Sequence, residues 1–533
     1  MEENSHTPKE EVEKASQRKD DLDKAPTVSG TVENPLSKET ENSTYYQLLK
    51  GLVDTGVLDI KLVLSPPRAG STLMETSFSK NPAIDAQIHE PFIALRKGKA
   101  EDAYKMIYEG VKPTIDAADS SKQTHVVIKE MSHWLETNNE HKRFFPLVES
   151  PPIFLIRNPL LNTESRVKKI LQTLDLREKA PVQETLLNYY AKTKGVESWA
   201  AMLASYAEVP DHTVDDEAVR LYRNNQRLAD LPEDPDIQPF PLQRWLLDYY
   251  AISNGHDRWK VMLKNEFDNR NYKAFGDILR DERIYGVEGA GWRATADNMK
   301  YLEDQGKHPI TVDSTDYRIN PEVIVPSLCE KWDIPYTEDM INWGDSNTAV
   351  NTGQTKPHQS IWYDRLQKSK GIEPPIEISP ILEDFPDFIA EHLADVDLPA
   401  YVAMFNRPTR LKSEKNIVQE KLAVPVKREV YKRLRDMGIL RFDMDIQGND
   451  ESDQAIFEIL SQKGLLNYSH EEADSLQDAY KKRIATIDLP LQDIDPVFAY
   501  LSNPELLDDE AFRQKNHRYL PTLERIKKVQ IGN

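Results

Sequence analysis

Cysteine is nearly absent from the chain, which has Cys329 alone among 533 residues. A single cysteine cannot form an internal disulfide, and its place in the apolar segment 325–329 favours an inert thiol buried on a helix. The sequence also has no clustered cysteines and no histidines at metal-ligand spacing. It therefore carries no zinc signature, and no metal is expected.

Long apolar runs and an excess of basic residues are missing as well. No segment reaches the length needed to cross a bilayer, and residues 1–5 lack the apolar core of a signal peptide, so we expect a cytoplasmic protein with no membrane partner. The 68 Lys and Arg residues are outnumbered by 89 Asp and Glu, which gives a formal net charge of −21. This charge argues against a nucleic-acid partner, so any anion must be held by a local pocket.

Short apolar segments alternate with helical periods in the first two thirds of the chain. Strands are expected at 62–64, 83–92, 124–129, 153–156 and 308–313. This alternation is typical of an α/β fold with a three-layer αβα arrangement around a parallel sheet. We assign residues 43–165 and 289–373 to the two halves of this core. In such sheets ligands bind beyond the carboxyl ends of the strands.

The remaining segments are interpreted separately. Residues 1–42 are polar and nearly free of aromatic residues, which predicts a disordered tail. Residues 166–288 form a predicted helical insertion with an internal repeat, because the pattern at 181–191 recurs 60 residues later at 241–251. A polar loop at 347–362 is long enough to fold over a ligand. Residues 374–533 are predicted to be mainly helical, and no chemistry is assigned to them.

The segment 61–74 is a predicted anion site, because an apolar strand runs through a tight loop into a helix. Gly70 allows close approach of a ligand, while Ser71 and Thr72 offer amides and hydroxyls at the positive end of the helix. Arg68 adds a guanidinium. Compared with the loop of nucleoside triphosphatases, Ser65 replaces the first glycine and Ser71 stands where the lysine should be. This departure weighs against ATP hydrolysis.

The loop resembles the 5′-phosphosulfate loop of sulfotransferases, and the similarity is closest for bacterial members. Arg157 follows the strand at 153–156 and Ser165 comes eight residues later, as in the pair that holds the donor 3′-phosphate in that family. Segment 312–336 is similar to the family's late strand, Asn-Pro and helix unit. The resemblance implies a P-loop-like fold and metal-free sulfuryl transfer from 3′-phosphoadenosine 5′-phosphosulfate (PAPS) to a hydroxyl or amine of a small-molecule acceptor. The donor-binding residues that it implies are Arg68, Ala69, Gly70, Ser71, Thr72, Leu73, Arg157 and Ser165.

The resemblance also suggests catalytic residues. Arg68 stands where the family's basic loop residue assists the leaving group. Glu90 is the favoured base, with His133 as the main alternative and His89 and Glu130 as further candidates; Glu90 could instead be a cap paired with a local cation. Lys129 ends a buried strand, where a charge is costly unless it meets an anion, so it should contact the sulfuryl group or a carboxylate.

Two other functions compete with this interpretation. A P-loop kinase or other phosphoryl transferase would bind ATP with magnesium, and the missing loop lysine counts against it. A non-catalytic scaffold would keep the fold and bind partners through the repeat and the C-terminal third.

Overall fold

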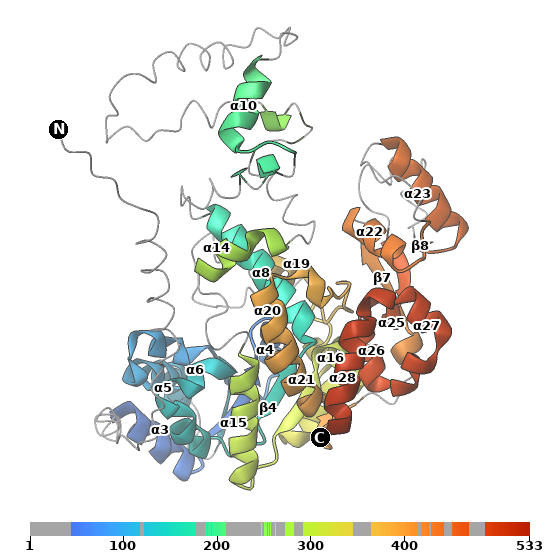
Figure 1. Ribbon diagram of the computed structural model, residues 1–533. Coiled ribbons are helices and arrows are strands. Elements are labelled where there is room, and N and C mark those ends of the chain that lie inside the picture. The colour runs from blue at the N-terminus through green and yellow to red at the C-terminus, as the bar shows by residue number, and fades with distance from the viewer. Residues whose placement is uncertain are drawn as a thin grey trace, which may run out of the picture.

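The core of the chain is a six-stranded, fully parallel sheet (Figure 1). The structure is a computed structural model that describes residues 44–117, 122–176, most of 187–208, isolated positions between 247 and 262, and residues 272–281, 291–344, 364–412, 417–425, 428–441, 450–467 and 486–532. The strands follow the order β2-β3-β1-β4-β5-β6. They are β1 Leu58–Ser65, β2 Ala86–His89, β3 Thr124–Met131, β4 Ile153–Ile156, β5 Ile310–Asp313 and β6 Arg410–Leu411.

Both faces of the sheet are buried, which explains the continuous apolar runs at 62–64 and 153–156. Val63, Ile153 and Leu155 pack with α4 (Ser71–Ser79) and α17 (Pro321–Lys331) on one face. Leu62 and Phe154 point to the other face, which is covered by α3 (Thr44–Asp54), α5 (Ala100–Ala117), α15 (Trp292–Asp304) and α21 (Leu398–Phe405). The predicted α/β class is confirmed.

The strand order places β1 at the point where the chain changes direction. After β1 the chain builds β2 and β3 on one side, then crosses to build β4, β5 and β6 on the other. Loops that leave neighbouring strands in opposite directions open a crevice at such a point. The loop after β1 therefore lies where an α/β sheet usually binds its ligand.

The helical insertion is described only in part. Helix α8 (Pro159–Leu176) begins before the predicted boundary at 166. In the described part of the repeat, equivalent positions are buried alike, including Trp199 with Trp259 and Met202 with Met262. The rings of Tyr190 and Tyr250, also equivalent, meet edge to face at 6.4 Å. The tail 1–42, the loop 347–362 and the repeat segments 181–186 and 241–246 lie outside the described residues.

The C-terminal segment is mainly helical but also contains strands. Helices α22 (Arg428–Asp436), α23 (Asp450–Gln462), α25 (Leu491–Ile494), α26 (Pro496–Ser502) and α28 (Leu520–Gly532) accompany an antiparallel sheet of β7 (Lys421–Pro425), β9 (Thr486–Pro490) and β8 (Leu466–Asn467). Helix α28 packs on α21, so the C-terminal segment adjoins the core (Figure 1). Within the described ranges, no helix is long and apolar enough to span a membrane.

Candidate functional site

The loop from Pro66 to Gly70 joins β1 to α4 through two residues with left-handed backbone. Arg68 has φ of 67° and Gly70 has φ of 98°. The carbonyl of Gly70 accepts from the amide of Leu73 at 3.0 Å, which starts the helix at Ser71. The first-turn amides of a helix have no acceptor within it, so those at Ser71 and Thr72 are suited to an anion. Ala69 of this loop is fully buried in the core cluster that contains Val63 and Met74, which anchors the loop on the sheet.

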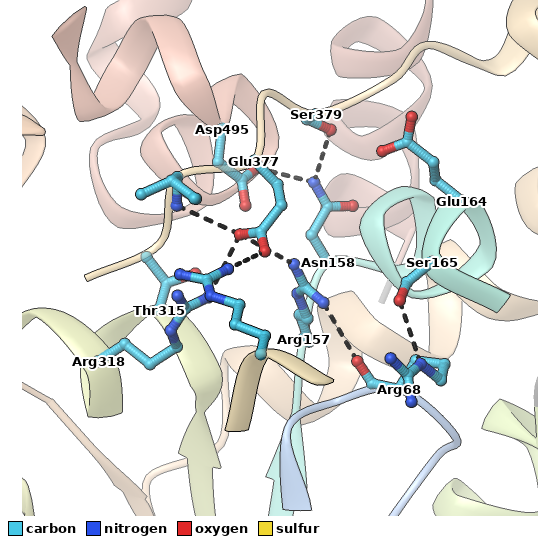
Figure 2. A network of polar contacts seen from close by, with 12 residues as sticks. Arg68, Arg157, Asn158, Glu164, Ser165, Thr315, Arg318, Glu377, Ser379 and Asp495 are labelled. Atoms are coloured by element: carbon cyan, nitrogen blue, oxygen red, sulfur yellow. Dashed lines mark hydrogen bonds and ion pairs between the residues drawn. The ribbon is translucent and has the colours of Figure 1, made fainter. Parts of the chain in front are cut away.

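Three predicted donor-binding residues meet at this loop, although they come from three separate segments. The Nε of Arg68 donates to Oγ of Ser165 at 3.1 Å, and Nη1 of Arg157 donates to the carbonyl of Arg68 at 3.2 Å (Figure 2). Arg157 directly follows β4, the neighbour of β1, and Ser165 lies on α8. Arg157 and Ser165 thus both contact Arg68, from opposite ends of that residue.

A carboxylate that the sequence did not reveal as part of the site lies beside Arg157. Oε2 of Glu377 is 3.6 Å from Nη2 of Arg157 and 3.4 Å from Nη1 of Arg318 (Figure 2). Oε1 of Glu377 pairs with Arg365. Burial by itself raises the pKa of Glu377, but the three arginines outweigh it and hold the pKa well below its usual range. Arg318 follows β5 within α16 (Ser314–Ile319), so the strand-end rule could have identified it.

A small pocket opens next to this ion-pair cluster, with room for about one water molecule. It is lined by Arg157, Leu161, Ser314, Thr315, Arg318, Pro375, Glu377, Leu491, Ile494 and Asp495. Three of these residues belong to α25 and its C-terminal boundary. The C-terminal segment, to which the sequence assigned no chemistry, therefore forms one wall of the site.

Asn158 fastens that wall to the sheet. Its Nδ2 donates to Oδ1 of Asp495 at 2.7 Å and to Oγ of Ser379 at 3.1 Å (Figure 2). Asp495 is buried, and burial together with the nearby charge of Asp313 raises its pKa to about 6. The neutral amide of Asn158 donates to Oδ1 without adding a third buried charge, while Oδ2 of Asp495 is buried and accepts no hydrogen bond from the described residues.

The catalytic candidates lie on the other side of β1, at the ends of β2 and β3. Lys129 is fully buried and pairs with Oε1 of Glu90, so it contacts one of the two kinds of partner predicted for it. His89 bridges two carboxylates: Nε2 is 3.4 Å from Glu90 and Nδ1 is 2.7 Å from Glu75. Burial raises the pKa of Glu90, but Lys129 and His89 outweigh that effect and lower it overall. Glu90 is therefore ionised at neutral pH.

Glu130 and His133 occupy different surroundings. Both carboxylate oxygens of Glu130 accept backbone hydrogen bonds at 2.7 Å, from the amides of Phe92 and Met131. Burial and the charge of Glu90 raise the pKa of Glu130 to about 8. His133 lies on α6 (Ser132–Glu136), close to the loop from Pro66 to Gly70. Gly291 adjoins both, since a Cβ placed on it would be 3.2 Å from Nδ1 of His133 and 3.3 Å from Cδ of Pro67. These contacts suit a structural role for Glu130, and Glu90, His133 and His89 remain the candidates.

No cluster of three or more His, Cys, Asp or Glu residues suited to a metal ion occurs among the described residues. No protein-family model matches the chain, and no curated protein matches it. A solved structure of a sulfotransferase domain from the curacin biosynthetic pathway matches with 11% identity and a TM-score of 0.24, covering 60% of this chain and 99% of that one. So low a score does not establish a common fold, and the interpretation of the site rests on the contacts described above.

Proposed function

We propose that the chain is a sulfotransferase that moves a sulfuryl group from PAPS to a hydroxyl or amine of a small-molecule acceptor. The observation that supports this most is the meeting of Arg68, Arg157 and Ser165 at the carboxyl ends of β1 and β4. These residues and the loop amides offer two anion sites next to each other, which suits a nucleotide with phosphates on both its 3′ and 5′ positions.

In the proposed reaction, the loop residues Gly70, Ser71 and Thr72 hold the 5′-phosphosulfate, and Arg157 with Ser165 holds the 3′-phosphate. The acceptor oxygen or nitrogen forms a bond to sulfur while the bond from sulfur to the bridging oxygen breaks. The electron pair stays on that oxygen and yields adenosine 3′,5′-bisphosphate, with Arg68 stabilising the developing charge. The proton of the acceptor passes to a base.

Glu90 remains the proposed base, with His133 as its rival. Glu90 is ionised and lies at the end of β2, on the side of the loop opposite Arg157. In that position Lys129 could stabilise a sulfuryl oxygen while Glu90 takes the proton. A base with a lowered pKa is weak, so the rate should fall only at acidic pH if Glu90 acts. Control of the rate by a histidine would instead give a titration near pH 6.5.

Calorimetry with adenosine 3′,5′-bisphosphate tests the donor site. Arg157→Ala should weaken binding by about 100-fold, since a guanidinium–phosphate contact in a partly buried site contributes roughly 2–3 kcal/mol. Adenosine 5′-monophosphate lacks the 3′-phosphate, so its affinity should fall far less, only through the lost bond from Arg157 to the loop carbonyl of Arg68. Arg525→Ala removes an arginine from an exposed ion pair with Asp395 and serves as the control. Wild-type protein that ignores the bisphosphate but binds ATP with magnesium would instead indicate a kinase.

The position of Glu377 supports a second candidate function, that of a non-catalytic scaffold. Glu377 already occupies the position beside Arg157, and the pocket there is small. A scaffold of this kind would bind the bisphosphate without transferring sulfuryl from PAPS to any acceptor in a broad panel. Labelled PAPS and mass spectrometry of the products separate the two candidates.

A further inference from the structure

Three arginines from distant parts of the chain converge on the single carboxylate of Glu377. Arg157 comes from the end of β4, Arg318 from α16, and Arg365 from α19 (Asp364–Lys368). The side chains of Arg157 and Arg318 are only 11% and 10% exposed, whereas Glu377 is 36% exposed. The cluster is therefore a pair of nearly buried cations covered by a more accessible carboxylate.

The ion pairs in this cluster are unevenly shared. Among the described residues, the three arginines form ion pairs only with Glu377 and Glu373. Oε2 of Glu373 is 3.8 Å from Nη2 of Arg365. Three guanidinium groups thus form ion pairs with two carboxylates, and the charge of the buried Asp495 also acts on Arg157. The two better buried guanidinium groups share one oxygen of Glu377. Arginine pairs best with groups that accept two parallel hydrogen bonds, and a phosphate monoester offers three oxygens and up to two charges.

The backbone on both sides of Glu377 is held by contacts that do not involve its side chain, although Oε2 of Glu377 also accepts from the amide of Ile376 at 3.2 Å. Arg318 donates from Nε to the carbonyl of Glu373 at 2.9 Å and from Nη2 to that of Pro374 at 2.7 Å. The amide of Ser379 donates to the carbonyl of Ile494 at 2.7 Å. With both flanks fixed, the Glu377 side chain can leave by rotating about its own bonds, which breaks its ion pairs and its bond from the Ile376 amide while the segment stays in place.

We propose that Arg157, Arg318 and Arg365 form a receptor for a phosphate monoester dianion, and that the Glu377 carboxylate occupies this receptor until phosphate displaces it. The inference deepens the proposed function and rests on it for the identity of the ligand: the dianion is the 3′-phosphate of the donor. Arg318 and Arg365 then join Arg157 as binding residues. Glu377 sets the donor concentration at which the site fills, because each binding event must break its ion pairs.

Inorganic phosphate tests the receptor without assuming a nucleotide. Calorimetry should show that Glu377→Gln binds phosphate about fivefold more tightly than wild type, since a partly exposed ion pair contributes about 1 kcal/mol. Adding Arg318→Ala to that variant should abolish the gain. Glu383→Gln removes the same charge from an exposed neighbour and should change nothing. Unchanged or weaker phosphate binding by Glu377→Gln would overturn the proposal.

Two additions keep the test decisive. Should Glu377→Gln fail to fold, Glu377→Asp is used, because its shorter side chain keeps the charge but cannot reach all three arginines, and it should also bind phosphate more tightly. Adenosine 3′,5′-bisphosphate is then titrated into the same proteins. A gain for phosphate without any nucleotide binding supports the receptor and refutes the sulfotransferase. Nucleotide binding by wild type, with no gain in the variant for either ligand, refutes the receptor alone.

Discussion

Replacing Glu90 by glutamine tests whether the ion pair at the end of β2 holds the fold together. The side chain of Lys129 has no exposure to solvent, and the side chain of Glu90 is 11% exposed. Removing one partner of a buried pair leaves an uncompensated charge and typically costs about 3–5 kcal/mol. The amide of glutamine still offers an oxygen to Lys129 but no charge. We therefore expect Glu90→Gln to lower the free energy of unfolding by about 3 kcal/mol.

Urea unfolding followed by circular dichroism at pH 7 measures this loss, and a double variant shows its origin. Glu90→Gln combined with Lys129→Met removes both charges and should restore all but about 1 kcal/mol, because apolar replacement of a buried pair is often neutral. A single variant that loses less than 1 kcal/mol, or two substitutions whose effects simply add, would refute the reasoning.

The double variant also separates folding from catalysis. A stable double variant that transfers sulfuryl groups at the wild-type rate would exclude Glu90 as the base. A stable double variant with donor affinity intact but no turnover would support a catalytic role for the pair of Glu90 and Lys129.

Three further results are expected. Burial raises the pKa of Asp59, but its bonds to His125 and Lys61 outweigh burial and lower the pKa to about 2, against 3.8 in the unfolded chain. About 2 kcal/mol of stability is therefore present above pH 4 and lost as the pH falls to 2. Urea unfolding of Asp59→Asn should lack this pH dependence. The pKa of Glu130 is raised, to about 8 against 4.5, and acts in the opposite sense. The stability that Glu130 contributes is present below pH 4.5 and lost as the pH rises through 8. The free energy of unfolding of Glu130→Gln should therefore depend less on pH between pH 6 and 9 than that of the wild type. Gly70→Ala should lower the melting temperature more than Gly306→Ala does, since both have positive φ but only the Cβ at Gly70 meets a neighbour, Oγ of Ser314 at 3.2 Å; equal shifts would contradict the contact.

The sheet could be predicted because its strands carry a local signal. Segments such as 124–129 and 153–156 are short, apolar and bounded by turn residues, and burial on both faces selects that composition. The loop at Gly70 and the spacing from Arg157 to Ser165 are likewise local, so the residues that meet there could be named in advance. Their detailed contacts could not: Ser165 bonds to Arg68, and Arg157 bonds to the loop carbonyl.

The remaining parts of the site depend on contacts between segments far apart in the chain. Glu377 meets Arg157 across 220 positions and lies in a proline-rich stretch that reads as a boundary. Asn158 meets Asp495 across 337 positions. No period or motif encodes such pairs, since they arise only when tertiary packing brings the segments together. For the same reason the pairing of Glu90 with Lys129 could be anticipated only as one possibility among several.

The shortest strand of the sheet has a consequence for how the chain can be shortened. β6 has two residues, and Arg410 within it pairs with the buried Asp316 and lies 3.7 Å from the ring centre of Phe405. A fragment ending at residue 373 would leave β5 as an open edge whose four residues are all buried in the full chain. Open apolar edges recruit strands from other molecules, whereas short edges that carry charge resist this. Strand β6, which belongs to the segment 374–533, therefore covers the edge of β5 that such a fragment would expose.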